Sequence, residues 1–373
     1  METELPADPA PDSGSAPNLA PEPTSPSRAV VPAPLPEEPP YRDRGTGLVI
    51  FGVLQIILGL LATLTIPLVA LGAFMSRLSP GGAMRPGQFI SSVATYASLA
   101  AALIILGIGS MQMKRWARAL TLITSWYGLI TGTLVTIMMT AALPVAMRSS
   151  LAQAQQNGAA PSSAISTGVM AVIVTLIIVF AAVFLVLLPI AFIIFYSRPD
   201  VAETCRRRDP VERWTDRTPL PVLGASVVLA IGAIYLLLVS VTTPLFPFFG
   251  RYLTGIPGSV CFLVMAALDA YIAVALFRLQ AVGWWIAVVS SLIRLLSMVL
   301  TYARADMVQA YSKIGMSDEQ LKILTSNPMF RGHIFLWWSL TSMVLLFGYL
   351  LWLKKYFKTP ASAPSDTLAT QAG

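Results

Sequence analysis

The stretch TGVMAVIVTLIIVFAAVFLVLLPIAFIIFY, residues 167–196, decides the fold class of this chain. It lies in an interval between Arg148 and Arg198 that contains no other Asp, Glu, Lys or Arg. A helix of about 20 apolar residues crosses the hydrocarbon core of a bilayer, so this stretch predicts a membrane-spanning helix. Comparable charge-free intervals run between Arg44 and Arg77, Arg85 and Lys114, Arg118 and Arg148, and Arg217 and Arg251.

The whole chain follows the same pattern, with 55% hydrophobic and only 12% charged residues. We therefore predict an all-α, polytopic integral membrane protein with about eight transmembrane helices. Because these helices use nearly the whole chain, no room is left for a soluble catalytic domain, and we expect no enzymatic activity. The predicted spans lie near residues 46–74, 89–112, 117–143, 168–196, 220–248, 257–279, 282–303 and 333–356.

The distribution of Lys and Arg predicts the orientation. With an even number of spans and the N-terminus inside, the inner segments hold 16 basic residues and the outer loops hold eight. The positive-inside rule then places both termini in the cytoplasm, and we expect residence in the cell inner (cytoplasmic) membrane of a bacterium. The basic residues beside the spans suit anionic lipid headgroups, and no nucleic-acid signal is present.

The chain also reads as two related halves. Thr65-Ile66-Pro67-Leu68 resembles Thr242-Thr243-Pro244-Leu245, and Gln112 with Trp116 resembles Gln280 with Trp284 at an offset of 168 residues. Since four spans return the chain to its starting side, this pattern favours two parallel four-helix repeats. The predicted segments are a disordered, acidic, Pro-rich cytoplasmic tail (1–44), a first four-span half (45–197), a basic cytoplasmic linker (198–219), a second four-span half (220–358) and a short cytoplasmic tail (359–373).

Asp269 and Arg294 are the only charged residues well inside the predicted spans. They flank the turn near Gln280 at similar depth on neighbouring antiparallel helices. Because an isolated charge at the bilayer centre costs about 2.5–3.5 kcal/mol on the insertion scale, we expect the two to pair. The pair has two readings: a structural clamp between spans six and seven, or a polar relay for a small solute or proton.

Two further features concern helix packing. Gly128 and Gly132 form a GxxxG element in the third span, which allows two helices to approach closely, within the chain or between two copies. Pro189 in the fourth span removes a backbone hydrogen bond and predicts a bend there.

The linker is the most distinctive polar segment. Its candidate lipid-headgroup contacts are Arg206, Arg207, Arg208, Arg213, Trp214 and Arg217. The alternative interpretation is that the positive charge of this segment only holds it on the inner side of the membrane. The run from Cys205 to Arg217, followed by Pro219-Leu220-Pro221-Val222-Leu223, resembles a group of uncharacterised multi-span bacterial membrane proteins. That resemblance implies membrane residence without a known activity.

Among functions, the apolar spans favour a non-enzymatic scaffold or interaction module with a protein partner or a second copy. The alternative is a transporter of a small solute or proton that uses Asp269 and Arg294. An intramembrane enzyme ranks third, because no paired acids or nucleophile–base set occurs within the spans. One histidine and two cysteines make no metal-ligand cluster, so we expect no metal and no cofactor.

Overall fold

The computed structural model describes residues 42–78, 86–156, 167–242, 244–305, 309, 312, 321 and 333–357. Within these residues, seven helices are long and apolar enough to cross a membrane, so the prediction of a multi-pass membrane protein is confirmed. These candidate spans are Gly45–Met75, Pro86–Met111, Arg115–Ala141, Ala171–Tyr196, Leu220–Thr242, Ile256–Phe277 and Ala281–Arg304. The two predicted tails lie outside the described residues, apart from Arg42–Arg44.

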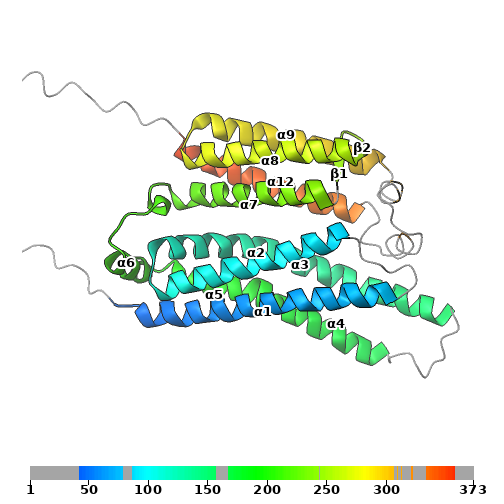
Figure 1. Ribbon diagram of the computed structural model, residues 1–373, viewed down its shortest axis with the longest axis horizontal. Coiled ribbons are helices and arrows are strands. Elements are labelled where there is room, and N and C mark those ends of the chain that lie inside the picture. Colours follow the sequence, from blue (N-terminus) through cyan, green and yellow to red (C-terminus); the bar gives the residue numbers. More distant parts are fainter. Residues whose placement is uncertain are drawn as a thin grey trace, which may run out of the picture. The chain divides into compact units, whose positions relative to one another are not determined.

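The described residues form helices, apart from one small hairpin and the short connections between elements (Figure 1). The helices of the first part are α1 (Gly45–Leu78), α2 (Pro86–Met111), α3 (Arg115–Gln156), α4 (Thr167–Ala182), the π-helix η1 (Val183–Leu187) and α5 (Leu188–Tyr196). The linker forms α6 (Pro199–Arg208) and the short 3₁₀-helix η2 (Trp214–Asp216). The second part contains α7 (Leu220–Thr242), α8 (Ile256–Phe277), α9 (Ala281–Arg304), α12 (His333–Leu353) and the 3₁₀-helix η4 (Lys354–Tyr356).

Helix α12 occupies the position of the eighth predicted span. It has 21 residues, but it is not one of the seven candidate spans. The count of eight therefore stays a prediction.

Close backbone contact joins α1 and α2. A Cβ atom added at Gly52 would lie 2.8 Å from the carbonyl oxygen of Gly107, and one at Gly107 would lie 2.7 Å from that of Gly52. Glycine at both positions is therefore required for this approach. Small residues at a helix crossing are the usual means of packing within a bilayer, where burial of apolar surface supplies no driving force between helices.

The fourth span changes its helical form just before Pro189. The Leu188 N–H donates to the carbonyl of Val183, five residues back, which is the π-helical pattern of η1. Proline has no N–H for the carbonyl of Leu185, so an ordinary α-helical ladder is interrupted at this point. The π-turn is the local rearrangement that accompanies this interruption.

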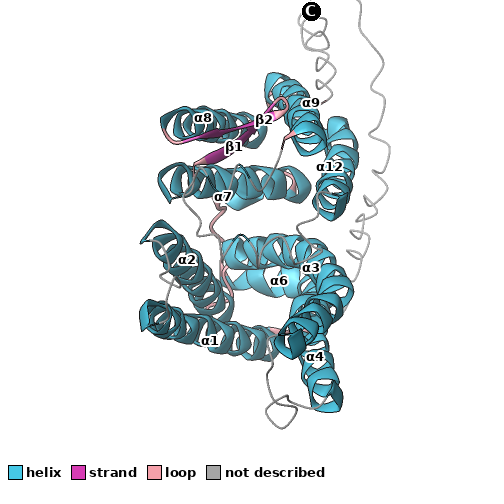
Figure 2. Ribbon diagram, turned by 90° about the vertical axis from the view of Figure 1, so that its right-hand side faces the viewer, coloured by secondary structure: helices cyan, strands magenta, loops and turns pink. Residues whose placement is uncertain are grey.

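The fifth span is shorter than predicted. Helix α7 ends at Thr242, and residues placed in the span by sequence instead form strand β1 (Leu245–Phe248), paired antiparallel with β2 (Arg251–Thr254). The physical reason is proline: Pro244 and Pro247 lack the N–H groups that a helix needs. The turn residues Phe249 and Gly250 both have positive φ, 38° and 95°, which suits a tight hairpin (Figure 2).

Two helix–helix turns share one geometry. Met113, between α2 and α3, has φ 56°, and Leu279, between α8 and α9, has φ 57°. In both turns the residue with positive φ donates to the carbonyl three residues back, and the next residue donates to the carbonyl five residues back. This is the hydrogen-bond pattern of a helix ending in the left-handed conformation.

Three clusters of buried apolar side chains connect the described helices. The largest joins α7, α8, α9 and α12 and contains Val222, Ala225, Ile272, Leu276, Trp284, Ala287, Val288, Leu350 and Leu353. A second joins α1, α3, α5 and α6 through Leu48, Leu122, Phe192, Tyr196, Val201 and Cys205. A third, of Ala119, Ile123 and Leu223, connects α3 to α7 and so links the two parts of the chain.

Candidate functional site

The structure brings Asp269 of α8 and Arg294 of α9 into direct contact. Arg294 Nη1 donates to Asp269 Oδ2 at 3.1 Å, and Nη2 donates to Oδ1. The two bonds form a bidentate ion pair, the strongest geometry open to a guanidinium and a carboxylate. The Asp269 side chain is 5% exposed and that of Arg294 is 27% exposed. Each carboxylate oxygen therefore accepts one hydrogen bond from the guanidinium.

Toward the turn at Leu279, the face of α8 that carries Asp269 continues with buried apolar residues. Ile272 and Leu276 follow Asp269 on the same face of α8 at helical spacing, and both belong to the largest apolar cluster. On α9 the ring of Trp284 is buried, and its Nε1 donates to the carbonyl of Leu350 at 2.7 Å. This end of the α8–α9 hairpin is thus packed with apolar groups, and the buried N–H of Trp284 has a hydrogen-bond acceptor.

Toward the other end, the β-hairpin is fastened to α9 one turn beyond Arg294. Ser297 Oγ donates to the carbonyl of Pro247 at 2.9 Å and accepts the N–H of Phe249 at 3.1 Å. One turn further, Thr301 Oγ1 accepts the N–H of Gly250 at 3.1 Å. Turn backbone that would otherwise need water is satisfied by α9 side chains.

These contacts belong to a polar stripe that sequence reasoning missed. Ser290, Arg294, Ser297 and Thr301 recur at intervals of three and four residues, which places them on one face of α9. Ser290, Ser297 and Thr301 are buried. Their spacing within an otherwise apolar span was the signal available in the sequence, because a polar stripe in a membrane helix points away from lipid.

In the linker, most of the candidate lipid-binding arginines contact acidic residues of the chain itself. Arg206 and Arg207 contact Glu203 at 3.1 and 2.9 Å, and Arg208 contacts Asp43 at 3.5 Å. The hydrogen bond from Arg207 lowers the pKa of the Glu203 carboxyl, with further help from the charge of Arg206. Trp214 and Arg217 are exposed.

A buried carboxylate fastens the linker to the α2–α3 turn. Asp209 is 3% exposed and lies 3.5 Å from Arg213 Nη2 and 3.8 Å from Lys114 Nζ. Its other oxygen accepts the backbone N–H of Arg115 at 3.4 Å. Nearby, Arg115 Nε contacts Asp216 at 3.3 Å. Arg213 therefore serves the internal structure of the linker.

Cys205 is buried in this region and forms no disulfide bond. Cys261, which is partly buried, forms none either. Burial raises the pKa of the Cys205 thiol to about 11, although the positive charge of Arg118 opposes the shift. A thiol with a raised pKa holds little thiolate at neutral pH and is a poor nucleophile.

The GxxxG element contacts the fourth span of the same chain. A Cβ atom at Gly132 would collide with the carbonyl oxygen of Leu185 in η1. That carbonyl lies four residues before Pro189, so it is the one deprived of its usual helical donor. At Gly128 the nearest atom is Pro189 Cγ at 3.9 Å, an ordinary contact. The close approach therefore depends on Gly132 alone.

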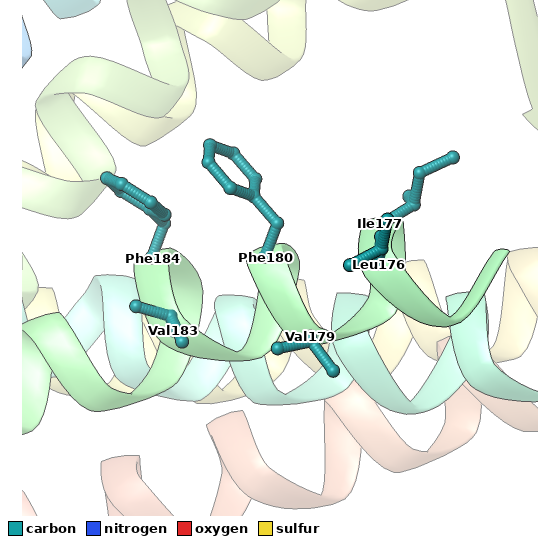
Figure 3. Close-up of a pocket in the computed structure, with 6 residues that line it drawn as sticks. All are labelled: Leu176, Ile177, Val179, Phe180, Val183 and Phe184. Atoms are coloured by element: carbon teal, nitrogen blue, oxygen red, sulfur yellow. The ribbon is translucent and has the colours of Figure 1, made fainter. Parts of the chain in front are cut away.

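An open apolar hollow runs along the fourth span. It is lined by Leu176, Ile177, Val179, Phe180, Val183 and Phe184, all from α4 and η1 (Figure 3). It offers no polar group for orienting a ligand. Such a surface on a spanning helix is the type that lipid tails contact.

Within the described residues, no group of three or more His, Cys, Asp or Glu side chains gathers in a way that could hold a metal ion. In comparisons with known proteins, no family model, no curated protein and no solved structure matched this chain.

Proposed function

We propose that this chain is a non-enzymatic membrane scaffold or interaction module, and that the Asp269–Arg294 pair is a structural clamp within it. The observation that carries the proposal is the bidentate pairing of these two charges. With each oxygen already accepting a hydrogen bond from the guanidinium, the carboxylate would have to give up this pairing to become the counter-charge of a substrate.

The surroundings of the pair support the clamp. Apolar packing lies on the side of Leu276 and Trp284, and the hairpin lies on the side of Ser297. A transport route needs polar groups that reach one surface and then the other. The apolar cluster interrupts such a route on one side of the pair.

The proposal includes eight spans in two parallel four-helix halves, with both termini cytoplasmic. The matched turns at Met113 and Leu279 support the repeat, since they give an offset of 166 residues. This is two residues less than the offset of 168 obtained from the Gln–Trp pattern. The hairpin turn at Phe249 would then lie on the outer side.

Close contacts flanking the two turns support the same register. A Cβ at Gly109 would lie 2.7 Å from Cβ of Ala117, and a Cβ at Gly283 would lie 2.6 Å from Cβ of Ala275. These are equivalent positions at the offset of 166, with glycine and alanine exchanged. At each turn, a glycine on one helix faces an alanine on the next, which allows a similarly close approach of the two helices.

The proposed partners are a bilayer with anionic headgroups and a protein partner or second copy. The 16 Lys and Arg residues assigned to the inner side, against eight outside, support the lipid, because basic residues beside the spans attract negatively charged leaflets. We propose the cell inner membrane of a bacterium as the location.

Thiol labelling tests the proposal. Single cysteines at Ala266 and Ala273, buried residues one turn on either side of Asp269, are placed in a Cys205→Ala/Cys261→Ala background. A small membrane-impermeant reagent should leave both unlabelled, while a cysteine at the exposed Phe249 should react. A cysteine at Val264, which is 61% exposed on the lipid side of α8, is the unreactive control. Labelling at 266 or 273 would reveal an aqueous path and remove the clamp proposal.

The second candidate is a transporter of a small solute or proton. It is favoured by the polar stripe of α9 and by Arg294 Nε, which is buried without a hydrogen-bond partner. An unsatisfied donor beside the pair is a place where a ligand oxygen or a water molecule could bind. Labelling that is blocked by a solute would select this function.

A further inference from the structure

A hydrogen bond between the linker and α8 brings two arginines to one place. Thr218 Oγ1 donates to the carbonyl of Phe277 at 3.2 Å, and the next residues along the chain are Arg217 on one side and Arg278 on the other. Both arginines are exposed. Within the described part of the chain, neither guanidinium forms a hydrogen bond or an ion pair.

Four of the other arginines of the linker are paired within the chain. Arg208 contacts Asp43, and Arg213 contacts Asp209. Arg206 and Arg207 are paired with Glu203. Asp216, the carboxylate adjacent to Arg217, is already contacted by Arg115 at 3.3 Å. Glu212 is exposed and lies five residues before Arg217. The positive charge at Arg217 and Arg278 is thus left for a partner outside the described chain.

An aromatic ring lies at the same place. The ring of Trp214 is centred 6.0 Å from the ring of Phe277, and Trp214 is 48% exposed. Phe277 is the last residue of candidate span α8, and Leu220 is the first residue of candidate span α7. The cluster therefore lies level with two span ends, where a bilayer presents its headgroups and where tryptophan is most stable.

We propose that Trp214, Arg217 and Arg278 form a binding site for the headgroup of an anionic phospholipid. The guanidinium groups bind the phosphate oxygens, since a planar fork of N–H donors fits phosphate geometry. The indole lies against the glycerol and the first methylenes of the acyl chains. This site rests on the proposed inner position of the linker, because the inner leaflet carries the anionic lipids.

Lipid titration of purified protein tests the site. The full chain in a neutral detergent is titrated with phosphatidylglycerol or phosphatidylcholine, and bound lipid is counted by native mass spectrometry. Phosphatidylglycerol should bind to the parent protein, and the R217Q/R278Q variant should bind it about tenfold or more weakly. Phosphatidylcholine should bind equally weakly to both.

The matched control is R206Q/R207Q, which removes the same charge from arginines that are already paired with Glu203. It should keep the parent affinity. An equal loss in both variants would leave only general surface attraction and overturn the site. Thermal unfolding in the absence of lipid should be the same for both variants, so a loss of binding by R217Q/R278Q is not a loss of folding.

Two further measurements distinguish a lipid ligand from a soluble phosphate. The W214A variant should weaken phosphatidylglycerol binding, because a headgroup at a bilayer surface needs the aromatic contact as well as the charges. Glycerol 3-phosphate and inorganic phosphate should not compete at millimolar concentration. Competition by either would identify a soluble phosphate as the ligand and overturn the proposal. None of these readouts depends on whether the chain acts as a scaffold or as a transporter.

Discussion

At the scale of single residues, the bidentate bond between Asp269 and Arg294 gives each charge a partner that the bilayer does not supply. Asp269→Ala would leave Arg294 unpaired within the span, at a cost of about 2.5–3.5 kcal/mol on the insertion scale. Asp269→Ala combined with Arg294→Ala removes both charges and should restore most of the lost stability. Expression level and thermal unfolding in detergent measure the difference. Arg304→Ala, a charge removal at the end of the same helix, is the control and should change little. Equal losses in the single and double variants would contradict the pairing energy.

The same scale shows how far residue types alone can predict a site. The depth and opposite signs of Asp269 and Arg294 were enough to predict their contact, because each charge has few partners in an apolar span. The acidic partners of the linker arginines could not be predicted from the sequence. Each of Glu203, Asp43 and Asp209 lies close to several basic residues, in sequence or in space. Where many charged residues lie close together, the sequence alone does not determine which acidic residue pairs with which basic residue.

At the scale of elements, the contact between α3 and the fourth span separates two glycines that look equivalent in sequence. Gly132→Ala should destabilise the protein by about 1–3 kcal/mol, because its methyl group would collide with the carbonyl of Leu185. Gly128→Ala should be neutral or slightly stabilising, since alanine favours the helix and the nearest atom is 3.9 Å away. Thermal unfolding of the two variants in the same detergent measures the contrast. Similar behaviour of both would show that this helix contact is looser than described.

The elements also show where the hydropathy pattern of the sequence fails to predict secondary structure. Long apolar runs predicted the helices, but hydropathy does not distinguish helix from strand at Leu245–Phe248. Pro244 and Pro247 were the decisive residues there, and their effect on backbone hydrogen bonding outweighs the apolar character of the run. The π-turn before Pro189 follows from the same lack of an N–H. A proline thus lies at both departures from regular helix, whereas Pro67 lies inside α1 without a change of helical form.

At the scale of the whole molecule, one labelling experiment determines both the orientation in the membrane and the number of spans. Cysteines at Arg42, Phe249 and Lys355 are introduced separately into the Cys205→Ala/Cys261→Ala background. Eight spans with the termini inside predict that 42 and 355 are protected from an impermeant thiol reagent in intact cells and react after permeabilisation. Phe249, in the hairpin between α7 and α8, should react in intact cells.

The three positions separate the alternatives because each extra crossing reverses the side of everything that follows. Without a crossing by α12, residue 355 would react in intact cells while 42 stays protected. Inverted orientation would expose 42 and 355 together and protect 249. The expected pattern follows from the excess of Lys and Arg on the segments assigned to the inside, since translocating those segments is opposed by their charge. It also follows from the repeat, because two parallel four-span halves require the linker and both termini to share one side.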